Sequence, residues 1–389
     1  MKKGENILVD KKRLVFLDVL RAAAFLLVFF YHFLVRIAEN GIAAQETVQK
    51  IYEHPNYHIA TLGVSLFFMI SGAGLMLSSN HKWNTKEYFQ KRAMRILLPF
   101  YIAYAGIFAA MYVMKGGQVF EEGIPNWHFI FTIAGVDGYL KEFGISTFSL
   151  GVGEWFLGCL IIMYVCFPLL RKWMFGSGEK CRKIFMAVAT LVYILLVLKD
   201  TSGLPVHMNF GVKLYEFILG MYFAGQLNDT EKVQREKKKK SETVYDRNEI
   251  DAEAKLVKVS RDVERWLIAA SILVLLTAFL CPVLLPIKEG FKITIVTLAV
   301  IFLMSQPEFL FEKRKTLIVV LKWFGTYSFE MYLIHHWIII VITGFAAKWI
   351  NGIGSLVLLF VVEMMVTLLG AVIVKRIADL FLVCYNKNL

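Results

Sequence analysis

Apolar residues in this chain come in long runs that short polar segments separate. Each run is about 18–25 residues long, the length that a helix needs to cross a ~30 Å hydrocarbon layer at 1.5 Å per residue. A transmembrane β-barrel would instead show alternating strands of about ten residues. We therefore predict an all-α, polytopic helical membrane protein with about ten spans, near 14–37, 59–79, 96–115, 153–170, 184–199, 211–226, 266–285, 291–305, 325–347 and 352–377.

Composition agrees with this pattern. Of the 389 residues, 57% are hydrophobic and 19% are charged, whereas a soluble domain is roughly 45–50% apolar and about 25% charged. This balance excludes disorder over most of the chain. It also excludes a water-soluble enzyme with one buried core.

Lysine and arginine are concentrated on alternate segments between the predicted spans. With the N-terminus placed in the cytoplasm, 33 of the 43 lie on inner segments and nine lie outside or at outer span ends. Because positive residues stay on the cytoplasmic side during insertion, this asymmetry predicts that both termini are cytoplasmic. The net charge of +12 thus reflects topology, and we expect a multi-pass protein of the plasma (cytoplasmic) membrane with no nucleic-acid partner.

One membrane domain over 14–377 accounts for most of the chain, between cytoplasmic tails at 1–13 and 378–389. Within it, residues 227–265 form a charge-dense cytoplasmic loop, which we interpret as solvated or facing anionic lipid. Two predicted outer loops, 38–57 and 115–152, are long enough to contribute to a site, and the second could hold a re-entrant piece.

The first span carries three ionisable residues at membrane depth, where such groups usually face the protein interior. Asp18 and Arg21 are three apart and can pair on one helix face. His32 follows Arg21 by eleven residues, about three turns, and returns to nearly the same face. An inward ion pair and a buried histidine are the structural alternative, but the aligned triplet favours a functional stripe.

Basic residues also gather where the third span begins. Arg92 and Arg95 are three apart, Lys91 lies beside them, and Pro99 frees the carbonyl near Arg95. Arginine forks suit phosphate oxygens. From spacing alone, however, an ordinary positive-inside anchor explains these residues better.

The ninth span holds a second polar group. Ser328 and His335 are seven apart and share a face, Tyr332 lies one turn before His335, and Glu330 points elsewhere. Hydrogen-bonded packing between helices and a role in a site are equally consistent with this pattern. A metal is not expected, because His335 and His336 point about 100° apart with no third ligand nearby. The five cysteines show no C-x-x-C spacing either.

Five blocks of the sequence resemble the membrane acyltransferase 3 family, the O-acyltransferases of bacterial surface glycans. They are the R-x10-H spacing of Arg21 and His32, GVSLFFMISG at 63–72, Arg92-x-x-Arg95 with Pro99 and Tyr101, EWFLGCLIIMYVCFP at 154–168, and TYSFEMYLIHH at 326–336. The resemblance covers residues 14–377. The chain departs from the family pattern at Ser65, where many members carry Asp, and at Phe329, where Tyr is usual, and both departures leave the acceptor class open.

The resemblance implies an acyl-CoA donor, most often acetyl-CoA, on the cytoplasmic side and an extracytoplasmic glycan hydroxyl as acceptor. Arg92 and Arg95, with Lys91, would hold the CoA phosphates at the inner mouth. The pantetheine arm would pass Arg21 and bring the thioester to His32.

On this hypothesis His32 is the general base on the acceptor hydroxyl, because imidazoles accept protons at neutral pH. A covalent acyl-histidine stays open, and Asp18 would orient Arg21. Residues of the ninth span would position the acceptor or stabilise the tetrahedral oxyanion; the candidates are His335, Ser328, Tyr332 and Glu330.

Two other classes of function are compatible with the same residues. Intramembrane Asp, Arg and His groups also occur in proton-coupled carriers, so a transporter or flippase for a glycan or lipid-linked intermediate is the main alternative. A membrane-embedded sensor or binding subunit without catalysis is the other. The oligomeric state and the sugar are open.

Overall fold

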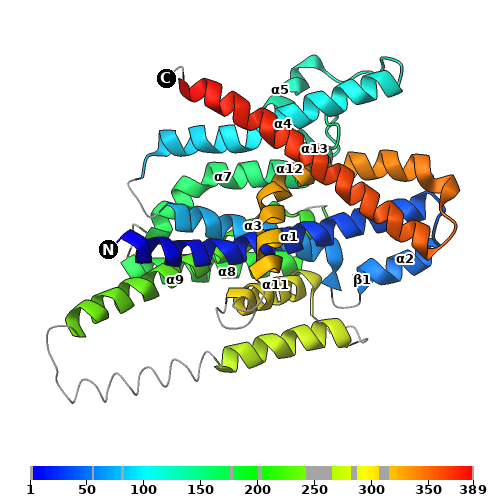
Figure 1. Cartoon of the computed structure of the whole chain (residues 1–389). Coiled ribbons are helices and arrows are strands. Elements are labelled where there is room, and N and C mark those ends of the chain that lie inside the picture. The colour runs from blue at the N-terminus through cyan, green and yellow to red at the C-terminus, as the bar shows by residue number, and fades with distance from the viewer. Residues whose placement is uncertain are drawn as a thin grey trace.

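The computed structural model describes residues 3–54, 57–79, 83–175, 178–199, 204–241, 265–281, 287–305 and 315–387. Most of them are helical (Figure 1). The helices are α1 (Lys3–Glu39), α2 (Gln45–Tyr52), α3 (Ile59–Ser78), α4 (Thr85–Met114), α5 (Phe129–Ile133), α6 (Asp137–Lys141), α7 (Glu154–Phe175), α8 (Gly178–Lys199), α9 (Phe210–Ser241), α11 (Glu289–Ser305), α12 (Lys315–Ala346) and α13 (Ile353–Lys387). The other described elements are a helix over Arg265–Leu280, 3-10 helices over Asn126–His128, Val206–Met208 and Ala347–Trp349, and the antiparallel pair β1 (Glu53–His54) and β2 (Tyr57–His58).

Seven described helices are long and apolar enough to cross a membrane: Phe16–Glu39, Ile59–Ser78, Thr85–Met114, Glu154–Met174, Gly178–Lys199, Val319–Trp349 and Ile353–Cys384. The prediction of an all-α, multi-pass membrane protein is therefore confirmed. The other three predicted spans fall mainly on α9, the Arg265–Leu280 helix and α11. The count of ten stays a prediction.

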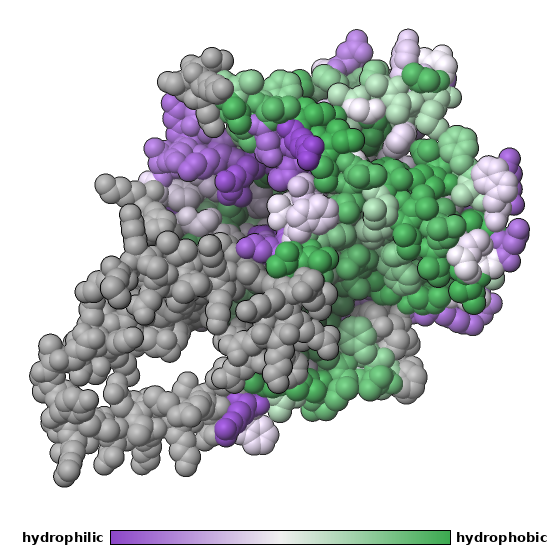
Figure 2. Space-filling view, in the orientation of Figure 1, coloured by the Kyte–Doolittle hydropathy of each residue, from purple (hydrophilic) through white to green (hydrophobic). Residues whose placement is uncertain are grey.

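The surface has the distribution of polarity that a bilayer requires. Figure 2 shows hydrophobic residues across the middle of the visible face, with hydrophilic residues toward the left and along the right edge. Leu191 on α8 and Leu369 on α13 are more than half exposed, as residues that contact lipid tails are. The first and last described residues lie at the same end of the bundle (Figure 1). That this end is cytoplasmic stays a prediction of the charge count.

Several helices extend well beyond the apolar runs that predicted them. α1 begins at Lys3 rather than near 14, and α4 begins at Thr85 rather than near 96. The side chain of Asn84 accepts from the first backbone N–H groups of α4 and so fixes its start. The predicted loop 227–265 begins as a continuation of α9 to Ser241, and residues 242–264 lie outside the described residues.

Glycines bring α3 and α9 into close contact. A Cβ atom on Gly72 would overlap the carbonyl oxygen of Phe217, and a Cβ on Gly220 would overlap that of Met69. Two reciprocal glycines thus let the two backbones touch, as small residues do between membrane helices. Because α3 also packs against α1, and α1 against α12, this contact joins α9 to the centre of the bundle.

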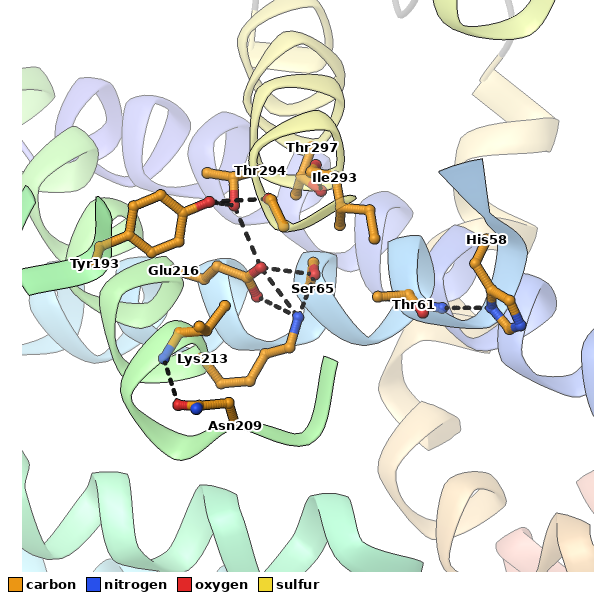
Figure 3. A network of polar contacts seen from close by, with 12 residues as sticks. His58, Thr61, Ser65, Tyr193, Asn209, Lys213, Glu216, Ile293, Thr294 and Thr297 are labelled. Carbon is orange, nitrogen blue, oxygen red and sulfur yellow. Dashed lines mark hydrogen bonds and ion pairs between the residues drawn. The ribbon is translucent and has the colours of Figure 1, made fainter. Parts of the chain in front are cut away.

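A buried polar network joins the same helices (Figure 3). The Lys213 ammonium on α9 lies 3.0 Å from Glu216 Oε1 and donates to Ser65 Oγ on α3 at 2.8 Å. Ser65 Oγ in turn donates to Glu216 Oε1 at 2.9 Å. Thr294 of α11 and Tyr193 of α8 extend the network through their hydroxyls, which are 2.8 Å apart.

The ion pair at the centre of this network is almost fully enclosed, since Lys213 and Glu216 are each 1% exposed. Charges at such depth cost free energy unless they are paired and hydrogen-bonded. Ser65 supplies the polar partner from α3. The network therefore fixes how α9 sits against α3.

Removing one charge of this pair should be far more harmful than removing both. Glu216→Leu leaves a buried, unpaired ammonium, and we expect it to cost about 3–5 kcal/mol of stability. The double variant Lys213→Met/Glu216→Leu should recover much of that loss, because no charge is then left without its partner. Thermal unfolding of the purified proteins in detergent measures both. A double variant no more stable than Glu216→Leu would contradict this account.

Candidate active site

Polar side chains from α1, α3, α6, α7, α12 and the segments around His58 and His207 meet in a cavity of about 330 Å³. The cavity lies toward the end of α1 and the beginnings of α3, α7 and α9, at the end of the bundle opposite the chain termini. Four of the chain's eight histidines line it: His32, His58, His207 and His336. The concentration of imidazoles in one cavity marks it as the candidate site.

Glu154 reaches this cavity from the first position of α7. Its φ is +45°, and no other residue except glycine has a positive φ in the part of the chain that the structure describes. Side chains disfavour this region, so the surrounding structure must hold the backbone there. Such strain is typical of residues whose side chain has to point in one direction.

The Glu154 carboxylate bridges two histidines. Its Oε1 lies 2.5 Å from Nδ1 of His336, and its Oε2 lies 3.4 Å from Nε2 of His32. The Glu154 side chain is only 14% exposed. Both carboxylate oxygens are therefore directed at imidazole nitrogens instead of solvent.

Arg36 determines the tautomer of His336. Its guanidinium nitrogen lies 3.1 Å from Nε2 of His336. Because arginine can only donate, Nε2 must accept, and the His336 proton resides on Nδ1 and is donated to Glu154. Arg36 also pairs with Glu39 one turn further along α1. His336 therefore accepts from the Arg36 guanidinium on one side of its ring and donates to the Glu154 carboxylate on the other.

His32 has the complementary arrangement. When its Nε2–H is donated to Glu154, the neutral ring carries its lone pair on Nδ1. A carboxylate that holds one imidazole nitrogen also stabilises the imidazolium that forms when the other nitrogen takes a proton. The pair can therefore accept a proton from a hydroxyl bound in the cavity.

His335 packs behind His32 and does not line the cavity. It is fully buried, and its ring centroid is 5.0 Å from that of His32. Its Nδ1 donates to the Tyr332 carbonyl at 2.8 Å, and its Nε2 has no hydrogen-bond partner. In this tautomer His335 offers a lone pair beside His32 rather than a donor.

His58 and His207 stand on another wall of the cavity, outside the spans. Their rings stack with centroids 6.3 Å apart. Burial lowers the pKa of His58, and burial, helped by the charge of Lys213, lowers the pKa of His207 to about 4. Both rings are therefore neutral at pH 7. His58 Nδ1 accepts from the backbone N–H of Thr61 at 3.4 Å, so the His58 proton lies on Nε2 as a donor.

The remaining predicted residues of the ninth span lie in different places. Tyr332 lines the cavity. Ser328 is buried and donates to the carbonyl of Gly325 in its own helix. Glu330 pairs with Lys375 of α13 at 3.2 Å. The structure brings Tyr332, but neither Ser328 nor Glu330, to the cavity.

Asp18 and Arg21 form the expected pair, with 2.6 Å between Oδ1 and the guanidinium. Arg21 lies against Gly74 of α3, where a Cβ would be 3.3 Å from its terminal nitrogen. It does not line the cavity that His32 lines. Along α1 the fully buried rings of Phe25 and Phe29 lie between Arg21 and His32.

The basic residues of α4 stand apart from the cavity. Lys91 is exposed and pairs with Glu87, and Arg95 is also exposed. Arg92 is half-buried over the rings of Tyr88 and Tyr164, and its Nε has no hydrogen-bond partner. Arg92 and Arg95 thus present guanidinium groups at the other end of the bundle from His32.

Four residues of the site were not predicted from the sequence: Glu154, Arg36, His58 and His207. Glu154 directly precedes Trp155 at the start of a predicted span. A carboxylate at the end of a span was the sequence feature that could have identified it. His58 and His207 lie in segments without helical periodicity. Only the packing of α3 and α9 brings these two rings together.

His32, Glu154 and His336 are the one set of three metal-ligand side chains, in the described part of the chain, whose ligand atoms lie within 4.8 Å of one another. The prediction that no third ligand lies near the two adjacent histidines is therefore wrong for His336, which has both His32 and Glu154 beside it. Two histidines and a glutamate suit zinc. Here, however, imidazoles take both carboxylate oxygens, and Arg36 places a fixed positive charge beside His336. We propose that this group holds protons and no metal.

One protein-family model, described as an acyltransferase domain, matches residues 14–376. Among curated proteins the chain is similar to acyltransferase MdmB of Streptomyces mycarofaciens, with 28% identity over 236 residues. That alignment covers 54% of this chain and 57% of the relative, so it spans little more than half of either protein. No solved structure matches the chain.

The proposal of a metal-free site is tested by metal content. Protein purified without chelator and incubated with zinc should bind no stoichiometric metal at this site, because Arg36 disfavours a cation there. Mass spectrometry of the metal in wild type and Glu154→Gln measures this. Stoichiometric zinc in the wild type that is lost in Glu154→Gln would contradict the proposal.

Proposed function

This chain belongs to the acyltransferase family, and on that premise we propose that it is an integral membrane O-acyltransferase. It would move an acyl group, acetyl in the first instance, from cytoplasmic acyl-CoA to a hydroxyl of an extracytoplasmic carbohydrate. The observation that carries this proposal is the contact of His32 with the carboxylate of Glu154 inside a polar cavity. A general base oriented by a carboxylate is what transfer to a hydroxyl requires.

The proposed reaction uses the free nitrogen of His32. His32 Nδ1 takes the proton of the sugar hydroxyl while the hydroxyl oxygen attacks the thioester carbonyl carbon. When the tetrahedral intermediate collapses, the carbon–sulfur bond breaks and the proton passes from His32 to the CoA thiolate. The products are the sugar ester and free CoA.

Neighbouring groups would support this transfer in distinct ways. Glu154 holds His32 in one tautomer and stabilises its protonated form, and the contacts of His336 and Arg36 hold Glu154 in place. Tyr332 lines the same cavity and has a hydroxyl that could donate to the developing oxyanion. A covalent acyl-histidine would use the same lone pair of His32.

Donor binding is proposed for the opposite end of the bundle. The half-buried guanidinium of Arg92, with an unpaired Nε, and the exposed Arg95 are suited to CoA phosphates, and Lys91 adds positive charge beside them. Arg21, held by Asp18 where α1 meets α3, lies along α1 between this end and His32. The acyl arm must then pass the level of Phe25 and Phe29 to reach the cavity.

Loss of the base should abolish transfer. We expect His32→Ala to lower acceptor-dependent CoA release from acetyl-CoA by about 10²–10⁴-fold. Glu154→Gln should lower kcat to a similar extent, because its one amide oxygen accepts from His336 and its NH2 group then donates to His32 Nε2, which moves the ring proton onto Nδ1. The exposed Glu46→Gln serves as the control with normal turnover. Near-normal turnover in correctly folded His32→Ala would remove the proposed base, and transport of unmodified glycan without CoA release would favour a carrier.

The basic residues of α4 should act on donor affinity. We expect Arg92→Ala/Arg95→Ala to raise KM for acetyl-CoA roughly tenfold or more with a smaller change in kcat, because charge-assisted contacts to phosphate are lost. Lys86→Ala, an exposed cation in the first turn of the same helix, is the matched control. An unchanged KM in the double variant would identify these arginines as positive-inside anchors only.

A further inference from the structure

A second cavity, of about 480 Å³, adjoins the one that contains His32. The two cavities share four lining residues: Lys141, Ser149, Gly151 and His336. The second cavity extends from this junction between α4, α12 and the segments around 119–124 and 144–151. It is not used by the reaction proposed above.

Gly151 lies where the two cavities adjoin and lines both of them. Gly151 has a φ of +74°, and a Cβ there would lie 4.0 Å from His336 Nδ1. A larger side chain at this position would stand between the two cavities. A ligand that occupies both cavities would therefore run past Gly151 and His336, which both linings share.

The lining of the second cavity combines rings with charged groups of both signs. Trp337 and Ile340 are three residues apart on α12 and share a face, and Phe120 faces them from the loop after α4. Lys115, Glu121 and the shared Lys141 surround these apolar residues, and all three are exposed.

This chemistry fits a sugar ring better than other ligands. A sugar has an apolar C–H face, which packs on an aromatic ring, and hydroxyls that both donate and accept hydrogen bonds. Lys115 and Lys141 offer donors and Glu121 offers an acceptor, so the lining matches hydroxyls, whereas a phosphate would leave the Glu121 carboxylate facing a like charge. A lipid chain would not favour a cavity with exposed lysines on its wall.

We propose that the second cavity binds the neighbouring ring of the acceptor, so that the acceptor is a glycan of at least two linked sugar units. The ring with the reacting hydroxyl occupies the His32 cavity, and the linkage passes Gly151. The next ring packs against Trp337. This inference rests on the function proposed above and adds the size of its acceptor.

The test uses acceptors of graded length. Surface glycan from source cells that lack the gene is cut by mild acid and separated into one-, two- and four-unit fractions. Purified protein is given acetyl-CoA with each fraction, and free CoA is measured. We expect kcat/KM to be about tenfold higher for two units than for one, as one further ring contact can supply.

Two variants change the second cavity in opposite ways. Trp337→Ala removes the ring that the second sugar packs on, and Ile340→Trp fills the cavity. Each should abolish most of the preference for two units over one. Trp349→Ala, at an exposed tryptophan in the 3-10 helix after α12, should keep the preference.

The outcomes separate this inference from the proposed function. Equal kcat/KM for one and two units, or a preference that survives both Trp337→Ala and Ile340→Trp, overturns the two-unit acceptor while the acyltransferase stands. Transfer to no fraction at any length overturns the proposed function, and the acceptor inference fails with it.

Discussion

The contact on which the site depends is the carboxylate of Glu154 between two imidazoles. One oxygen lies 2.5 Å from His336 and the other lies 3.4 Å from His32, so three helices meet at a single group. Arg36 extends the chain of contacts to a fourth side chain and compels His336 to donate toward Glu154. Donor and acceptor directions are therefore assigned for Glu154, His336 and Arg36, and Nδ1 of His32 is left without a described contact on the cavity side of His335.

The helices that carry this cluster must hold fixed positions, and close contacts between their backbones provide this. Reciprocal glycines bring α3 against α9, and Gly325 lets α12 approach the backbone of α1 at Asp18. α1 and α12 thus hold His32 and His336 in fixed relation, and α3 holds the wall with His58. The membrane provides little hydrophobic force between helices, so such contacts have to set their positions.

The sequence was sufficient for the features that depend on local spacing. Apolar run length predicted the membrane helices, and a separation of three residues predicted the Asp18–Arg21 pair. It was insufficient to tell which side chains of the ninth span reach the cavity: Glu330 pairs with Lys375 of α13, and Ser328 donates to the Gly325 carbonyl of its own helix. Glu154 is the clearest case. Its direction comes from a left-handed backbone at a helix start, which no periodicity encodes.

The buried pair of α9 bears on how the chain enters the bilayer. Lys213 and Glu216 are three residues apart, so ammonium and carboxylate can meet on one helix without a contribution from another helix. The Lys213–Glu216 pair carries no net charge, so the free-energy cost of inserting this part of α9 into the bilayer is lower than for either charge alone. Ser65 of α3 completes the hydrogen bonds of this pair where α9 packs against α3.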